Sequence, residues 1–301
     1  MEGIKEILGR YRNPLVLFII FCGFFTVAAL IVGSLIAEQD ISPFIFGTGG
    51  LEMIILFVLM WPLAAIIGGV VISYFLAPVF LFIHKKAIGR KMNYGIQERV
   101  ASQEFKKTFR AFFPALVAIN FALMLAPDNY IQQVVTSEYA QQVGFPGITI
   151  VTFVALLMFT FGIAMMLFGS VWFLLDAGIV YSNKEKVEKE NVDQPIEGRA
   201  VGGWYLSLLK GYAGIGVIFS YYQLVFVFFL EGSFGGFVLS PIMVVNILIW
   251  FPLMLIIAIA AIPALILLDL IKEHRRNYIR NWANRFGITE NVEIIMQEKG
   301  R

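Results

Sequence analysis

LEMIILFVLMWPLAAIIGGVVISYFLAPVFLFIHKK, residues 51–86, is apolar almost throughout and ends in two lysines. A helix rises about 1.5 Å per residue, so about 20 apolar residues cross the roughly 30 Å hydrocarbon core of a bilayer. The stretch exceeds that length, and its only acidic residue, Glu52, stands near its start. We therefore predict a membrane-spanning helix here rather than the core helix of a soluble protein.

The composition of the whole chain agrees with this interpretation. Hydrophobic residues make up 59% of the 301 residues and charged residues only 15%, whereas about a quarter of a soluble domain is charged. We predict an all-α polytopic membrane protein with six transmembrane helices, forming a single membrane domain over residues 1–301. The predicted spans are residues 14–37, 51–84, 111–126, 148–181, 211–230 and 241–271.

The positions of Lys and Arg predict the orientation of these spans. All 23 basic residues lie in the N-terminal segment, in the segments 85–110 and 182–210, or after residue 271. Basic residues concentrate on the cytoplasmic side of membrane proteins. We therefore predict a multi-pass protein of the cell membrane with both termini in the cytoplasm. The first span is too long for a cleavable signal and is expected to be retained.

Internal similarity suggests a threefold repeat of helical hairpins. A shift of 190 residues places Trp61-Pro62-Leu63 on Phe251-Pro252-Leu253 and His84 on His274. The predicted spans also alternate short and long. We predict three tandem short-long hairpins that share one orientation, because each contains two spans. The predicted repeats cover residues 10–96, 107–190 and 205–288.

Several function classes are excluded by what the sequence lacks. The single Cys22 and two His are too few for a multi-cysteine metal site, and the net charge of +2 is too small to indicate a nucleic-acid partner. Neither the GK[ST] phosphate loop, HExxH, CxxC nor GxSxG occurs. We expect no enzymatic activity, no cofactor and no metal.

Asp176 and Asp269 interrupt the fourth and sixth spans near their inner ends. Ionisable groups inside spans are costly and are candidates for function. Two alternatives remain open for both. Each is an interfacial carboxylate paired with a nearby Lys or Arg, or the two line a cytoplasmic vestibule that binds a cation or relays protons.

The two histidines and four neutral polar residues are weaker candidates. His84 and His274 stand among basic residues at the inner boundary, as interfacial anchors or as a pH-sensing gate. The neutral residues lie within spans and either hydrogen-bond between helices or line a transport pathway. They are Asn120, Tyr222, Gln223 and Asn246.

Residues 272–290 predict a basic amphipathic helix on the cytoplasmic face. Tyr278, Trp282 and Phe286 recur every four residues, and arginines surround them. Such a helix binds anionic lipid headgroups, or docks a soluble partner such as an ATPase. The basic residues assigned to this contact are Arg275, Arg276, Arg280 and Arg285. The segment 85–110 is expected to form a short surface helix, and 182–200 a solvated connector.

Together these patterns favour a transport protein or channel-like permease subunit of unknown substrate. The alternative is a non-catalytic membrane scaffold or an assembly subunit of a larger complex. The expected partners are the bilayer with its anionic lipids, and a soluble ATPase or other membrane subunits.

Overall fold

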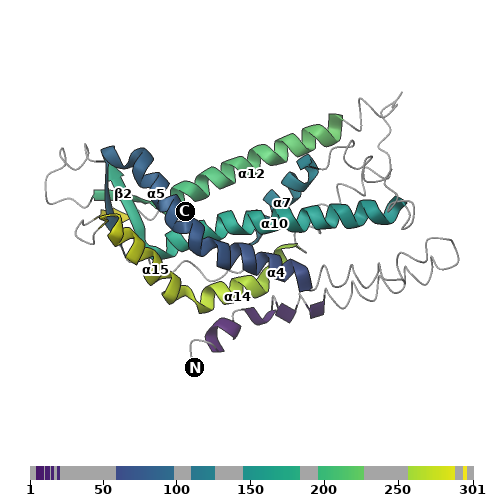
Figure 1. Ribbon diagram of the computed structural model, residues 1–301, viewed down its shortest axis with the longest axis horizontal. Helices are drawn as coiled ribbons and strands as arrows, with labels where there is room; N and C mark the ends of the chain where they lie inside the picture. The colour runs from purple at the N-terminus through teal and green to yellow at the C-terminus, as the bar shows by residue number, and fades with distance from the viewer. Residues whose placement is uncertain are drawn as a thin grey trace.

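The structure of the chain is a computed structural model. It describes residues 5–9, 11–13, 15–16, 19–20, 59–97, 110–125, 145–183, 196–226, 257–288 and 294–296. Within these ranges the structure describes the backbone alone for residues 123–125, 145–154, 183, 196–197, 216–226 and 294–296. The described part is mostly helical, as predicted, but it also contains a small sheet (Figure 1).

Two described helices are long and apolar enough to cross a membrane, spanning Trp61–Lys91 and Ala155–Ala177. The first is built from α4 (Trp61–Ile66), the π-helical turn η2 (Ile67–Ile72), α5 (Ser73–Ile88) and the short η3 (Gly89–Lys91). The second lies within α10 (Phe145–Ala177). These two helices fall on the predicted second and fourth spans.

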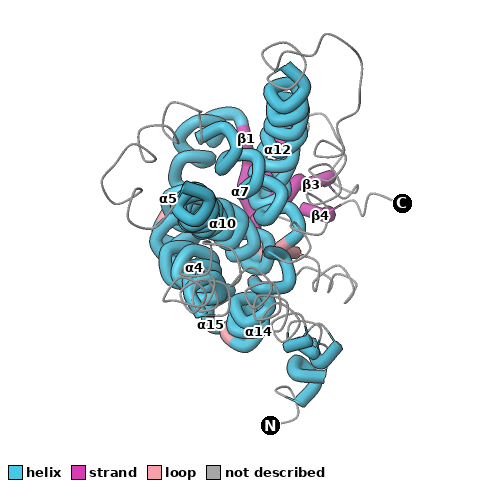
Figure 2. Tube along the Cα trace, turned by 90° about the vertical axis from the view of Figure 1, so that its right-hand side faces the viewer, coloured by secondary structure: helices cyan, strands magenta, loops and turns pink. Residues whose placement is uncertain are grey.

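The helix α10 lies at the centre of the described bundle. Figure 2 looks along the helices and shows the others arranged around it, and α10 contacts most of them directly. The surrounding helices are α4–α5, α7 (Phe112–Leu125), α12 (Val201–Phe226), α14 (Ile262–Leu270) and α15 (Lys272–Arg285). The central position explains why α10 has buried residues on several faces, including Phe161, Phe168 and Phe173.

The helix pair η2 and α10 meets at a glycine contact. Gly68 and Gly69 face Gly162, Met165 and Gly169 so closely that a Cβ on Gly68 would overlap the carbonyl oxygen of Gly162. Ser73, one turn further on, donates a 3.2 Å hydrogen bond to the carbonyl oxygen of Met166 on α10. Small residues allow such close backbone approach between helices, so glycine is required at this crossing.

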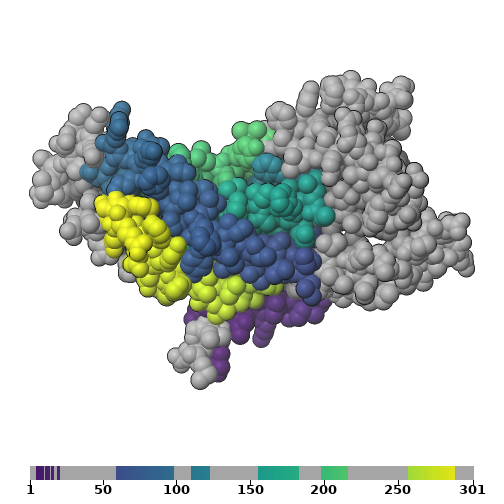
Figure 3. Space-filling view, viewed as in Figure 1, coloured from purple at the N-terminus to yellow at the C-terminus, as the bar shows by residue number. Residues whose placement is uncertain are grey.

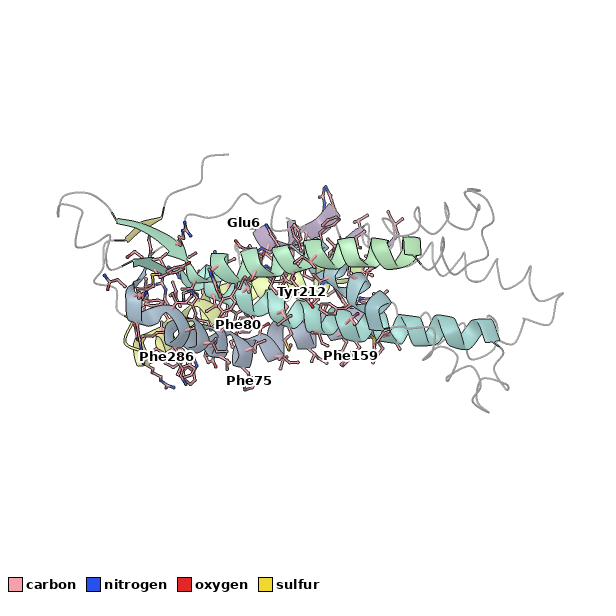
Figure 4. The ribbon with its side chains drawn as sticks, turned by 90° about the horizontal axis from the view of Figure 1, so that it is seen from above. Glu6, Phe75, Phe80, Phe159, Tyr212 and Phe286 are labelled. Carbon is pink, nitrogen blue, oxygen red and sulfur yellow. The ribbon has the colours of Figure 1, made fainter. Side chains whose placement is uncertain are left out.

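The opposite face of the first long helix carries an exposed apolar stripe. Its members recur every four residues, so each lies on nearly the same side of the helix as the next. They are Leu63, Ile67, Val71, Phe75, Val79 and Ile83, with Phe82 beside the last. Phe75, at 71% exposure, is the most open, and it lies at the edge of the bundle in Figure 4. A stripe of this kind is typical of a helix face in contact with lipid.

A four-stranded sheet lies at one end of the helices, where the prediction had no strands. Its strands are β1 (Met92–Ile96), β2 (Ile179–Asn183), β3 (Ile196–Ala200) and β4 (Ile294–Met296), in that order. β1 and β2 pair antiparallel with Tyr94 opposite Tyr181, β2 and β3 pair antiparallel, and β3 and β4 run parallel. The prediction of an all-α fold was wrong in this respect.

The sheet also corrects the two predicted inner segments. The segment 85–110 begins as the end of α5 and continues into η3 and β1 rather than a surface helix, and its residues 98–109 lie outside the described part. The connector 182–200 contributes the end of β2 and all of β3. The strands were not predicted because each is only three to five residues long and pairs with strands distant in sequence.

Gly178 marks the change from helix to sheet after α10. Its φ of +73° is rarely adopted by residues with a side chain, and its carbonyl oxygen accepts a 2.9 Å hydrogen bond from the backbone N–H of Gln97. The predicted fourth span therefore ends at Ala177 rather than at Tyr181, and Tyr181 belongs to β2. In the same way α12 begins at Val201, ten residues before the predicted fifth span.

Candidate functional site

Asp176, the residue before the last of α10, forms an ion pair with Arg275 of α15. The Arg275 side chain is fully buried, and its guanidinium carbon lies 5.1 Å from the centre of the Phe173 ring. Phe173 and Asp176 are three residues apart, so both project from one side of α10. This side of α10 therefore offers Arg275 a carboxylate partner and an aromatic face together.

Asp269, near the end of α14, holds the second carboxylate. The hydroxyl of Tyr11 donates a 2.9 Å hydrogen bond to it, and Arg110 Nη1 lies 3.8 Å from its other oxygen. Arg110 also lies over the ring of Trp172, 5.9 Å from its centre. Residues distant in sequence thus meet around one buried acid.

These side chains form a two-arginine, two-aspartate cluster, which we define as Asp176, Asp269, Arg110 and Arg275. With all four ionised the cluster is electrically neutral. Burial lowers the pKa of the Arg275 guanidinium, and the charge of Arg110 adds to this effect. Asp176 and Asp269 act in the opposite direction and raise it. Since an arginine stays protonated in proteins, the carboxylates are what make its burial tolerable.

The cluster bears directly on the two alternatives for the acids. Both stand next to an arginine, which is the arrangement that the structural alternative describes. The sequence did not identify Arg110 or Tyr11 as members of the site, because a basic or aromatic residue near a span end is ordinary in membrane proteins. Whether the acids also serve transport stays a prediction.

His84 lies in a buried aromatic box near the C-terminal end of α5. Its Nδ1 is 2.9 Å from the hydroxyl of Tyr94, and the rings around it belong to β1, β2 and α12. Among the described residues no partner is found for its buried Nε2. The rings of the box are those of Tyr94, Tyr181, Trp204 and Tyr205.

Burial favours the neutral form of the three tyrosines of this box. Burial raises the pKa of Tyr94, with Tyr181 and Tyr205 adding to the shift. Burial also raises the pKa of Tyr205 to about 12, and its hydroxyl donates a 2.8 Å hydrogen bond to the carbonyl oxygen of Phe80. The box therefore ties α5 to α12 through uncharged hydrogen bonds and ring contacts, and the sequence prediction identified only His84 among its members.

His274 has different surroundings from those of its predicted equivalent. Its ring is exposed and lies 6.1 Å from the ring of Tyr74. The two histidines are therefore not brought together, and a shared gating role for them stays a prediction. The predicted internal repeat, which aligned His84 with His274, also stays a prediction.

The neutral polar candidates are only partly described. Asn120 is buried in α7, and within the described part of the chain its Nδ2 has no hydrogen-bond partner. Tyr222 and Gln223 lie in α12, but their side chains are outside the described residues, and so is Asn246. A polar pathway along these positions stays a prediction.

The tail helix α15 differs most from its prediction. It ends at Arg285 rather than at residue 290, and its buried side is formed by Arg275, Ile279 and Ala283 rather than by the aromatic stripe. The aromatic residues Tyr278, Trp282 and Phe286 are only partly buried, at the edge of this buried side. The helix was expected to lie on the membrane, but it packs on α5 and α10, so a different side faces inward.

This packing separates the four arginines that were predicted to bind lipid or a partner. Arg275 is buried in the cluster, and Arg280 Nε donates a 3.1 Å hydrogen bond to the carbonyl oxygen of Ala177. Arg276 lies 3.7 Å from the exposed Glu273. Arg285 is exposed, with its guanidinium carbon 4.9 Å from the centre of the Trp282 ring. Arg285 is therefore the best placed of the four for a contact outside the chain.

No family model, curated protein or solved structure matches this chain.

Proposed function

We propose that this chain is a multi-pass integral membrane transport protein, or a permease subunit, whose pathway closes at the cytoplasmic end. The membrane part of the proposal is supported by the two long apolar helices and by the exposed stripe on α4–α5. It is supported further by the sheet, which gathers three predicted inner segments at one end of the bundle (Figure 1). The six spans and the cytoplasmic termini belong to this proposal.

Cysteine labelling tests the proposed topology. In a Cys22→Ser background, we expect a membrane-impermeant maleimide to label Ser137→Cys and Ser233→Cys on intact cells. Ser102→Cys should react only after the cells are opened, because residue 102 lies in a proposed cytoplasmic segment. Labelling of Ser102→Cys on intact cells, or protection of both outer positions, would contradict the six-span arrangement.

The observation that carries the transport proposal is the two-arginine, two-aspartate cluster. Removing charges from water costs free energy. A buried ion pair therefore often stabilises a protein less than well-packed apolar residues in the same place would. The pairs of this cluster join α10 to α15, and α14 to the segment before α7. Contacts of this kind are suited to a closed state that opens when one pair is exchanged for a cation or a proton. We therefore propose small cations or protons as the transported class.

Ion flux into proteoliposomes tests this proposal, with potassium and protons as the probes. Asp269→Asn keeps an acceptor for Tyr11 but removes the attraction to Arg110, so the closed state should weaken. For whichever of the two ions is transported, we expect a faster entry rate. The rate should rise about tenfold for each 1.4 kcal/mol by which the closed state is destabilised relative to the open state. Glu273→Gln is the matched control, since it removes an equal charge from an exposed position. If all three proteins admit both ions no faster than empty vesicles do, the transport proposal is wrong.

The second candidate is a non-catalytic scaffold or assembly subunit. It is favoured by the same pairs, because each carboxylate already has an arginine within the chain. In that case the cluster only fixes the helices relative to one another. Asp269→Asn would then lower the unfolding temperature without any change in flux.

A further inference from the structure

The exposed apolar stripe of α4–α5 ends at a surface shared with α15. There the ring of Phe82 lies 5.8 Å from that of Phe286, and Phe286 lies 5.7 Å from Trp282. α5 and α15 lie side by side on the face shown in Figure 3. Phe82 is about half exposed and continues the stripe. Aromatic side chains therefore gather where the apolar surface stops.

Two exposed cations border these aromatic rings. Lys86 Nζ lies 5.9 Å from the centre of the Phe82 ring, and Arg285 lies over Trp282. The neighbouring Lys85 is used differently, because it donates a hydrogen bond to the carbonyl oxygen of Phe286 and so ties α5 to the end of α15. This hydrogen bond joins the two helices that carry Lys86 and Arg285.

The charges of Lys86 and Arg285 are not neutralised within the described chain. The ion pairs found there involve Arg110, Arg275 and Arg276, and none involves these two residues. Exposed cations over aromatic rings, next to an apolar surface, match the chemistry of a lipid headgroup region, where phosphates lie beside the carbonyl and acyl groups.

The length of the stripe indicates a bilayer rather than a protein groove. Leu63 to Ile83 covers 20 residue steps, which is about 30 Å of helix and equals the thickness of the hydrocarbon core. Lys85 and Lys86 follow immediately. An anionic leaflet at this end presents a phosphate at the level of these cations and an acyl chain along the stripe.

We propose that the junction of α5 and α15 is a binding site for an anionic phospholipid of the inner leaflet. Lys86 and Arg285 bind the headgroup phosphate, Phe82 and Trp282 lie at the glycerol level, and one acyl chain follows Val79 and Phe75. This site rests on the membrane part of the proposed function and not on transport. The proposed site differs from the lipid contact predicted from the sequence. Arg275 and Arg280 point into the protein, so Lys86 takes their place beside Arg285.

Native mass spectrometry of the full chain, purified in detergent, tests the site. The probes are phosphatidylglycerol and phosphatidylcholine with identical acyl chains. We expect the wild-type protein to bind phosphatidylglycerol more tightly. The double variant Lys86→Gln/Arg285→Gln should weaken that binding about 30-fold, because each cation near an anionic lipid surface contributes about fivefold. Binding of phosphatidylcholine should change little.

The matched control is Lys5→Gln/Arg12→Gln, which removes two exposed basic residues of the N-terminal segment, outside the junction. It should retain the preference for phosphatidylglycerol. The site is overturned if the wild type binds both lipids equally, if the double variant keeps the preference, or if the control loses it to the same extent. It is also overturned if inorganic phosphate displaces the lipid at equal concentration, since a free anion would then be the ligand.

Failure of the site is distinguishable from failure of the proposed function. Lipid binding is measured without any flux, and sidedness is measured by cysteine labelling. Selective binding without flux supports the site and contradicts transport, whereas flux without selective binding contradicts the site alone.

Discussion

Gly68→Ala is expected to lower the free energy of unfolding by about 3 kcal/mol or more, which is at the upper end of overpacking effects. The reason is the contact with α10. A Cβ on Gly68 would overlap the carbonyl oxygen of Gly162 and approach the backbone nitrogen of Met166 at 3.3 Å. These atoms belong to a helix backbone and cannot rotate away as the end of a flexible side chain can. The two helices would have to separate, and the hydrogen bond from Ser73 to Met166 would lengthen.

The measurement is reversible unfolding in mixed micelles, followed by circular dichroism. Gly211→Ala is the control, because nothing lies within 4 Å of a Cβ added at this exposed position of α12. That substitution should stabilise the helix by up to about 1 kcal/mol, as alanine does in exposed helix interiors. Gly169→Ala should resemble Gly68→Ala, since its Cβ would overlap the carbonyl oxygen of Gly69. Equal stabilities for Gly68→Ala and Gly211→Ala would show that the helices do not cross at these glycines.

This crossing illustrates how far the sequence predicts the bundle. Hydropathy located the long helices, and adjacent small residues such as Gly68-Gly69 permit close packing between helices. The partner could not be recognised, because glycines occur throughout the spans and their pairing depends on which helices become neighbours. The central position of α10 is likewise set by tertiary packing and not by its own composition.

The cluster and the sheet show the same limit for the candidate site. Asp176 and Asp269 stood out because acids are rare in apolar segments, and the expected basic partners were present in the sequence in large number. The choice of Arg275 for Asp176 depends on which side of α15 faces the bundle, and the aromatic stripe at Tyr278, Trp282 and Phe286 favoured a different side. The sheet adds partners for His84 from strands too short to predict.

Arg275→Met is expected to lower the free energy of unfolding by about 3–5 kcal/mol, the usual cost of removing one partner of a buried ion pair. The substitution retains an apolar chain of similar length but leaves the carboxylate of Asp176 without its cation. Asp176→Asn should also destabilise, because the guanidinium of Arg275 is fully buried and loses its charged partner. Its Nε and Nη1 already have no hydrogen-bond partner among the described residues, so the remaining contact with Phe173 cannot replace the carboxylate.

The double variant Asp176→Leu/Arg275→Met decides what the pair contributes. It removes both charges and leaves apolar groups in their place, so it should regain most of the stability that either single change loses. Unfolding of Asp176→Leu, Arg275→Met and the double variant in mixed micelles completes the cycle. Glu273→Gln is the exposed control, expected within about 0.5 kcal/mol of the wild type. Additive losses in the double variant would mean that Asp176 and Arg275 do not interact. A double variant as stable as the wild type, but altered in ion flux, would mean that the pair serves opening and closing rather than folding.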